Sequence, residues 1–234
     1  MGTRSQLLLV VLAVFGLAGC QPEAAPVRQE DSYFLWAGVT PPDRLVEAKR
    51  VYVLAGEVRA REPGVFVPLR PQPPSVRGSQ VWLVVRTETL YWDEAVYQRI
   101  AREMALWDKS TRLVGLQVDF DAATHGLWEY GRFLRGVRAR LPDRYRLSIT
   151  GLMDWSANGD PRALERLAGT VDEAVIQTYQ GRSTIPGYEA YLKRIERLPF
   201  DYRIGVVEDG GWKEPAYLAR DPHYRGTVTF LVEP

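Results

Sequence analysis

The stretch LVGLQVDFD, residues 113–121, decides the fold and carries the strongest functional signal of the chain. Successive side chains of a strand point to opposite sides, so this stretch has two faces. One face is apolar: Val114, Leu116, Val118 and Phe120. The other holds Gly115, Gln117, Asp119 and Asp121. The apolar face requires covering helices, and the polar face predicts an interior with carboxylates, which are costly to bury without partners.

Seven further stretches are rich in β-branched and aromatic residues and predict strands: residues 32–39, 50–60, 81–87, 146–155, 172–180, 202–208 and 227–233. Helical spacing or helix-start residues predict helices between most of them: residues 41–49, 93–109, 127–141, 160–171, 188–198 and 214–220. Residues 61–79 contain five prolines and predict an irregular connection.

Eight strands that alternate with helices indicate parallel pairing through crossovers, and eight strands close a barrel. We expect an α/β fold, a (β/α)8 TIM barrel that is irregular after the second strand and lacks the last helix. A doubly wound open sheet is the alternative. The barrel is expected to form a single domain over residues 32–234.

The carboxyl ends of barrel strands meet at one rim, where barrel enzymes place their active sites. Alternation predicts that one side-chain set on each of three more strands faces the lumen. These sets are Ser148, Thr150, Leu152 and Asp154 on the fifth strand, Val175, Gln177 and Tyr179 on the sixth, and Thr227, Thr229, Leu231 and Glu233 on the eighth. The sequence therefore predicts a polar site at this rim.

Residues 113–121 resemble the strand-four motif of family 18 glycoside hydrolases, the chitinases and their relatives, whose pattern is D-G-x-D-x-D-W-E. Gly115 matches the glycine and Asp119 matches the second lumen aspartate. Gln117 stands in place of the first lumen aspartate, Phe120 in place of the tryptophan, and Asp121 in place of the general-acid glutamate.

The stretch IQTYQ is similar to the M-x-Y-D segment of the same family, with Tyr179 on the tyrosine and Gln180 on the aspartate. Over residues 33–234 the chain also resembles a domain-of-unknown-function family of bacterial lipoproteins with a glycosidase-like barrel. The resemblance implies chemistry in which the substrate's own acetamido group attacks. Asp121 would then be the acid, Asp119 would orient the acetamide, and Tyr179 would assist.

Alternatives remain open for these catalytic candidates. Asp121 can instead pair with Glu208 or Asp209 at the seventh strand, as two carboxyl groups do in other glycosidases. Asp119 and Asp121 can be structural, bound to Arg86, and Tyr179 can be a packing residue. The predicted substrate-binding residues are Trp36, Gln117, Asp154, Gln177, Gln180, Glu208 and Glu233, with Trp82, Trp155 and Trp212 as further sugar platforms and Glu57 as a further rim candidate.

The N-terminus predicts a lipoprotein signal over residues 1–19. Residues 7–17 are an apolar run of the length of a signal-peptide core, too short to span a bilayer comfortably. The run leads into Leu-Ala-Gly-Cys, which resembles the bacterial lipobox and implies that Cys20 is acylated and becomes the first mature residue. Residues 20–31 are expected to be a tether, and Gln21 in place of aspartate favours the outer membrane, facing the periplasm.

The composition of the chain limits the classes of partner and cofactor that we expect. The formal net charge of +1 gives no reason to expect nucleic acid binding. The chain has one cysteine and two distant histidines, so we expect no metal site and no cofactor. Three functions remain: a membrane-anchored glycoside hydrolase acting on an envelope or exported polysaccharide, a catalytically inactive glycan-binding barrel, or an envelope scaffold.

Overall fold

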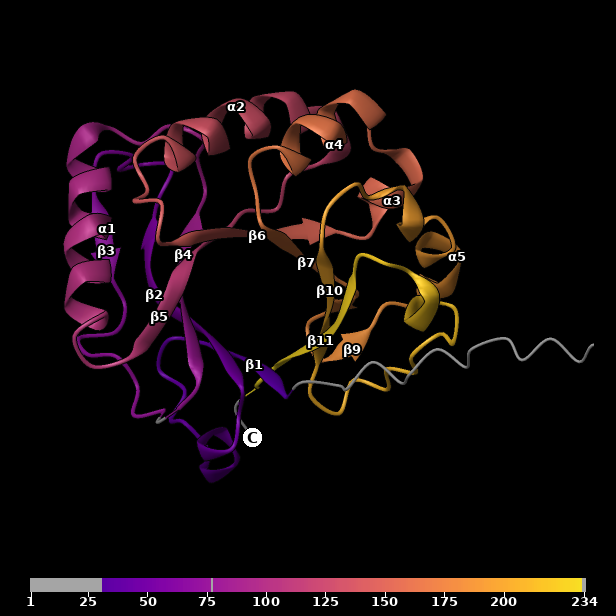
Figure 1. Cartoon of the computed structure of the whole chain (residues 1–234), viewed down its shortest axis with the longest axis horizontal. Coiled ribbons are helices and arrows are strands. Elements are labelled where there is room, and N and C mark those ends of the chain that lie inside the picture. Colours follow the sequence, from indigo (N-terminus) through magenta and orange to yellow (C-terminus); the bar gives the residue numbers. More distant parts are fainter. Residues whose placement is uncertain (1–30, 77, 233–234) are drawn as a thin grey trace, which may run out of the picture.

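Eight parallel strands close into a barrel. The computed structural model describes residues 31–76 and 78–232, so the predicted signal, Cys20, Gln21 and Glu233 lie outside the described residues. The strands follow one another around the barrel in the order β1, β2, β4, β5, β6, β7, β10 and β11, and β11 pairs back onto β1 (Figure 1). Their bounds are Ser32–Leu35, Arg50–Val58, Gln80–Thr87, Arg112–Asp119, Arg146–Leu152, Glu173–Gln177, Tyr202–Val207 and Tyr224–Phe230. The predicted (β/α)8 barrel is confirmed.

The helices between the strands are longest after β4, β5 and β6. They are α1 (Glu94–Trp107), α2 (Leu127–Arg138), α3 (Asp154–Asn158), α4 (Pro161–Ala168) and α5 (Tyr188–Leu192). Caps explain two of their starts, because Asp93 and Asp160 each accept two backbone N–H bonds at the first turn. The predicted helices over 41–49 and 214–220 shrink to the 3-10 turns η1 (Asp43–Val46) and η4 (Leu218–Arg220), and the one over 188–198 divides into α5 and η3 (Ile195–Arg197).

A short antiparallel strand, β3 (Phe66–Pro68), lies in the proline-rich connection and was not expected. It pairs with residues 56–58 of β2, whereas β1 pairs with residues 50–53, and β4 occupies the other edge of β2. The four-residue β1 therefore leaves the carboxyl-terminal half of this edge of β2 without a partner strand. There β3 pairs with the backbone N–H and C=O groups of β2. The two remaining strands, β8 (Tyr179–Gln180) and β9 (Ser183–Thr184), form a separate hairpin.

The core consists of two apolar layers. The larger layer lies between the outer face of the barrel and the helices. The smaller fills the lumen and consists of Phe34, Tyr52, Leu54, Trp82, Val84, Val175, Val228 and Phe230. In β5, Gln117 and Asp119 face the lumen as alternation predicts, because Leu116 and Val118 pack in the outer layer. Val114 was predicted to face outward, but it packs against the lumen cluster, because the pairing with β4 shifts its register at this residue.

The predicted lumen face of the last strand is wrong. Val228 and Phe230 belong to the lumen cluster, whereas Leu231 packs in the outer layer. Thr229 therefore faces outward and lines a surface hollow with Tyr33 and Val206. No α-helix follows β10 or β11 in the described part of the chain, so this outer face keeps contact with water and carries polar residues.

The amino-terminal end of the lumen is closed by a buried polar cluster. Glu173 accepts a hydrogen bond from the Tyr52 hydroxyl, and its other oxygen lies 3.6 Å from the Nε of Arg203. Burial is the main cause that raises the pKa of Glu173, and Arg50 opposes it. This end is therefore filled, which leaves the opposite rim as the place for a site. Within the described ranges no helix has the length and apolar character needed to cross a membrane.

Candidate functional site

Asp119 is the last residue of β5 and points into the lumen near its carboxyl end. Its side chain is 6% exposed. The Thr150 hydroxyl on the neighbouring β6 donates a 2.9 Å hydrogen bond to Asp119 Oδ1, and the Phe120 N–H donates to the same hydroxyl oxygen at 3.1 Å. Thr150 thus fixes the carboxylate through a relay from the backbone.

The environment changes the acidity of Asp119. Burial raises its pKa to about 6, while the Thr150 hydrogen bond and the charge of Arg86 lower it and the charge of Asp121 raises it slightly. Two carboxyl groups with different environments are the usual arrangement for acid–base chemistry. Burial, rather than the closeness of the two carboxylates, is the main cause here. Asp121 follows the end of β5 and is exposed.

Tyr179 lies beside both carboxylates. Burial raises its pKa well above the usual range, and the charges of Asp119 and Asp121 add to this effect. Its ring packs at 4.9 Å from that of Phe230, and Trp36 packs at 5.9 Å from the same ring. Both rings are partly exposed. Tyr179 and Trp36 therefore form an aromatic floor at the mouth beside the carboxylates, a surface suited to sugar faces.

Gln117 lies two residues deeper in β5 and is fully buried. Its Nε2 donates a 3.0 Å hydrogen bond to Ser148 Oγ, and its Oε1 has no partner among the described residues. The side chain is inside the lumen, as predicted, but is covered. It supports the base of the site rather than its surface.

Several predicted site residues lie elsewhere. Asp154 does not extend β6 into the lumen, because it begins α3 and accepts a hydrogen bond from Asn158. Gln180 is exposed on the β8–β9 hairpin, whereas Gln177 is half-buried at the end of β7. Glu208 lines the outward-facing hollow beside Val206, which weakens its pairing with Asp121.

Of the four tryptophans predicted as sugar platforms, some lie at the mouth of the barrel and others lie elsewhere. Trp82 is fully buried within the lumen and Trp155 within the outer layer, so neither can be a sugar platform. Trp212 packs at 4.8 Å from the ring of Tyr188. Trp36 is the one of the four predicted platforms that lies at the mouth with Tyr179.

Sequence reasoning missed three contributors. Thr150 was predicted only to face the lumen. Arg86 was considered only as a structural partner, yet it has no ion pair within 4.0 Å in the part of the chain that the structure describes. Tyr130 of α2 is fully buried, its hydroxyl has no described partner, and burial and then the two aspartates raise its pKa well above the usual range. Register alone places Arg86 opposite Asp119, which is the signal that could have found it.

A half-open hollow of about 140 Å³ lies away from the carboxylates, between α1, α2 and the outer face of β5. It is mostly apolar and is lined by residues such as Tyr97, Met104 and Leu116. Chemistry rather than cavity size therefore identifies the site. The described residues include no group of three or more His, Cys, Asp and Glu side chains placed to hold a metal.

Residues 83–195 match a family model described as "Domain of unknown function (DUF3142)". The matched stretch includes Arg86, Asp119, Asp121 and Tyr179. A comparison with curated protein sequences finds no match.

Solved structures share the barrel. The spore cortex-lytic enzyme SleL of Bacillus cereus is 18% identical with a TM-score of 0.52, over 80% of this chain and 52% of SleL. The chitinase domain of the spore coat protein CotE of Clostridium difficile is 13% identical with a TM-score of 0.53, over 83% of this chain and 68% of that domain. The chitinase-like lectin of tamarind is 9% identical with a TM-score of 0.52, over 86% of this chain and 94% of the lectin. This chain spans about half the length of SleL, and at these identities the likeness is one of fold.

Proposed function

We propose that this protein is a glycoside hydrolase that cleaves an envelope or exported polysaccharide at the carboxyl-terminal mouth of the barrel. The observation that carries the proposal is the pair Asp119 and Asp121, one buried with a pKa near 6 and one exposed, beside Tyr179. Glycosidases need one carboxyl group that holds a proton near neutral pH.

The two carboxyl groups have separate roles in this proposal. Asp121 is exposed, so a glycosidic oxygen can reach it, and in its protonated form it gives its proton to that oxygen as the bond to the anomeric carbon breaks. Asp119, whose pKa burial raises to about 6, holds a proton near neutral pH and passes it to Asp121, and the water that completes hydrolysis gives a proton back. The attacking oxygen comes from water or from an acetamido group of the substrate.

A second candidate is a glycan-binding barrel without catalysis. The fully buried Gln117 favours it, because an amide stands where the resemblance to family 18 implies an acid. The exposed carboxylate of Asp121 is compatible with this candidate too, because it can accept hydrogen bonds from sugar hydroxyls without transferring a proton. The aromatic floor of Trp36 and Tyr179 fits both functions.

The protein would work at a membrane. The lipobox-like Leu-Ala-Gly-Cys sequence supports an anchor on Cys20, and Gln21 supports the outer membrane, facing the periplasm. Two or more acyl chains make a stable anchor where one does not. The substrate would then be a polymer that passes through or covers the envelope.

The test is release of reducing ends from a panel of bacterial polysaccharides, including N-acetylated ones. We expect Asp121→Asn to lower the rate by about 100-fold or more while binding persists. Glu208→Gln is the matched control, because Glu208 is a carboxylate at the same rim that faces outward. Loss of activity in Glu208→Gln as well as in Asp121→Asn would replace this pair with the alternative pair of Asp121 and Glu208. Binding of a glycan without release of reducing ends would favour the inactive glycan-binding barrel. If the protein neither cleaved nor bound any glycan, the envelope scaffold would be the remaining function.

A further inference from the structure

Arg86 is an exposed cation at the mouth of the barrel. It is the penultimate residue of β4 and pairs in register with Asp119 of β5. Alternation along β4 places it on the same face as Trp82 and Val84, which belong to the lumen cluster. Its side chain therefore emerges from the lumen beside the two carboxyl groups.

The guanidinium of Arg86 makes no direct contact with those carboxyl groups, although its charge lowers the pKa of Asp119. Within the described residues it makes no hydrogen bond and no ion pair within 4.0 Å. Thr150, rather than Arg86, donates to Asp119. An arginine whose role was structural would be expected to close onto the buried carboxylate, because an unpaired buried charge is costly.

Two other arginines near this end have partners. Arg59 forms an ion pair with Glu57, and Arg70 donates to the backbone carbonyl oxygens of Trp36 and Val39. Arg70 thereby holds the segment that carries the aromatic floor. Arg86 differs because all five of its N–H donors remain available to a ligand.

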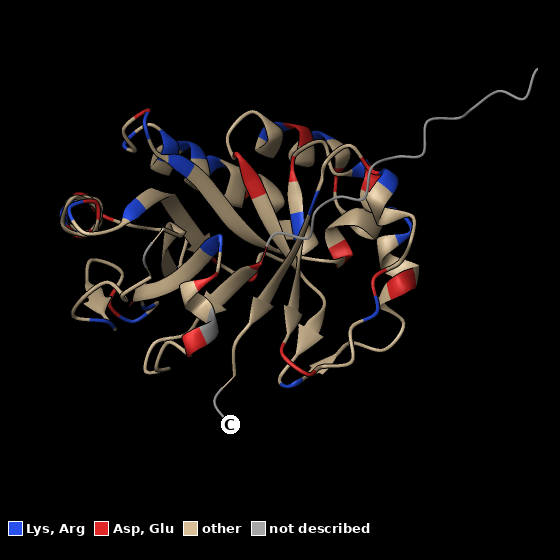
Figure 2. Ribbon diagram, turned by 60° about the horizontal axis from the view of Figure 1, so that its bottom comes forward, with Lys and Arg blue, Asp and Glu red and all other residues tan. Residues whose placement is uncertain are grey.

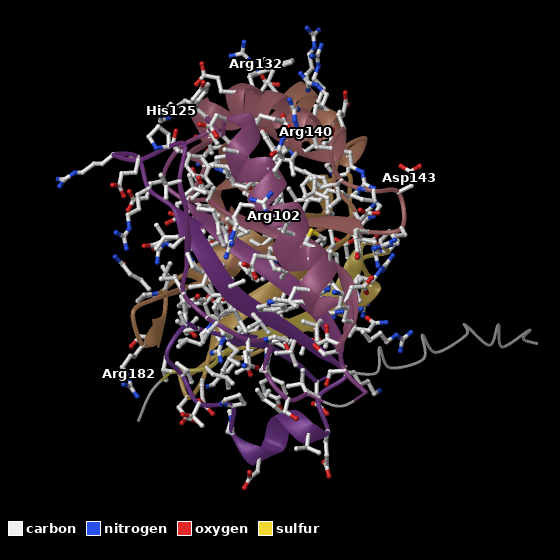
Figure 3. The ribbon with its side chains drawn as sticks, turned by 90° about the vertical axis from the view of Figure 1, so that its left-hand side faces the viewer. Arg102, His125, Arg132, Arg140, Asp143 and Arg182 are labelled. Atoms are coloured by element: carbon white, nitrogen blue, oxygen red, sulfur yellow. The ribbon has the colours of Figure 1, made fainter. Side chains whose placement is uncertain are left out.

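Charges of both signs lie at the end toward which the strand arrows point, so this rim is not a general polyanion-binding surface (Figure 2). Seen from the side of α1, Arg182 and His125 lie at one end of the barrel and Asp143 lies at the other (Figure 3). A single free guanidinium beside the catalytic pair therefore suggests recognition of one group rather than attraction of a whole polymer. A planar guanidinium fork matches a carboxylate with two parallel hydrogen bonds.

We propose that Arg86 binds a carboxylate of the glycan and that the substrate is an acidic polysaccharide with a carboxylate-bearing sugar at this mouth. This inference rests on the proposed function and narrows its substrate class. A neutral glycan would leave the cation without a partner, and an acidic glycan without Arg86 would meet the repulsion of Asp119 and Asp121. The carboxylate can belong to a uronic acid or to the lactyl ether of a muramic acid.

The experiment measures dissociation constants by calorimetry at pH 7 for pairs of ligands that differ only in the carboxylate. One arm uses uronic acid oligosaccharides of four to six sugars and the same oligosaccharides after carboxyl reduction. The second arm uses muramic-acid-containing glycan strands with free lactyl groups and their carboxyl-reduced forms. The protein is the full chain, compared with Arg86→Gln, Arg86→Lys and the control Arg59→Gln.

We expect the wild-type protein to bind one carboxylated ligand about tenfold more tightly than its reduced form, as one charge-assisted pair allows. Arg86→Gln should abolish this preference without weakening binding of the reduced ligand, and Arg86→Lys should keep part of it. Arg59→Gln should behave as wild type, and thermal melts should show all variants folded. The arm that shows the preference identifies the source of the carboxylate.

Equal affinity for both members of each pair, or a preference that survives in Arg86→Gln, would overturn the inference. Binding or cleavage of neutral glycans with no carboxylate preference would overturn it while leaving the proposed function intact. No binding of any glycan by the wild-type protein would overturn both.

Discussion

Asp119 has a carboxyl group that the fold keeps almost out of water, with 6% of its side chain exposed. Its pKa is raised from 3.8 to about 6, so between these values the folded state binds a proton that the unfolded state has lost. The contribution of Asp119 to stability therefore falls as pH rises from about 4 to about 6. Above this window the ionised group destabilises the fold.

We predict that Asp119→Asn raises the free energy of unfolding at pH 7.5, by on the order of 2–3 kcal/mol for a shift of about two pKa units. The gain should disappear below about pH 3, where the carboxyl is mostly protonated in both states. Urea denaturation at the two pH values measures the difference. Asp121→Asn is the control, since Asp121 is exposed and should change stability little. An equal effect of Asp119→Asn at both pH values would contradict the prediction.

Single residues were predicted well where strand alternation alone decides the outcome. Gln117 and Asp119 lie in the lumen because the apolar partners on either side of them need the outer layer. The role of Thr150 depends on a neighbouring strand, and strand-to-strand register is not contained in either segment alone. The same limit applies to Arg86, whose position opposite Asp119 arises only when β4 and β5 pair.

Between elements, the pairing of β5 with β6 depends on one glycine. Gly115 lies opposite Arg146, and a Cβ on it would lie 2.0 Å from the Arg146 carbonyl oxygen and within 3.0 Å of two more backbone atoms. Backbone cannot move aside as a flexible side chain can. Only glycine therefore permits this close approach of the two strands.

We predict that Gly115→Ala destabilises the barrel by about 2–3 kcal/mol or more, because overpacking against backbone forces the strands apart. Chemical denaturation measures this loss. Gly126→Ala is the matched control, since its Cβ meets no atom within 4 Å and its φ of −95° suits alanine. If both variants lost the same stability, close strand approach would not be the cause.

Elements were predicted where the local signal is strong and missed where neighbours decide. Capped, periodic segments such as α1 and α4 form as expected. The three-residue β3 was missed, because it exists only to fill the edge of β2 that β1 leaves open. The face of β11 was predicted wrongly because polarity was taken to mark the lumen, whereas at β11 it marks an outer face that no α-helix covers.

At the scale of the whole molecule, strand counting predicted closure, and the pairing of β1 with both β2 and β11 confirms it. The cover of helices is uneven. Helices α1 to α5 lie along the left, the top and the right of the ring of strands, and no labelled helix lies beside β1 at the bottom (Figure 1). The number and order of the strands follow from local sequence patterns. The thickness of the helical layer depends instead on how each long connection packs against the barrel.

Attachment to a membrane, which the lipobox-like sequence predicts, would affect the choice of substrate, because it would confine the barrel to the length of a tether. Cys20 is the only cysteine, so any thiol-linked acylation must occur there. We predict that the wild-type protein incorporates an alkyne analogue of palmitate and that its first residue by mass spectrometry is acylated Cys20. Cys20→Ser should lose the label completely, because serine offers no thiol to the acyl donor, whereas Asp121→Asn should be labelled as wild type. An unlabelled wild-type protein, or a mature N-terminus at another residue, would contradict the anchor without affecting the chemistry proposed for the barrel.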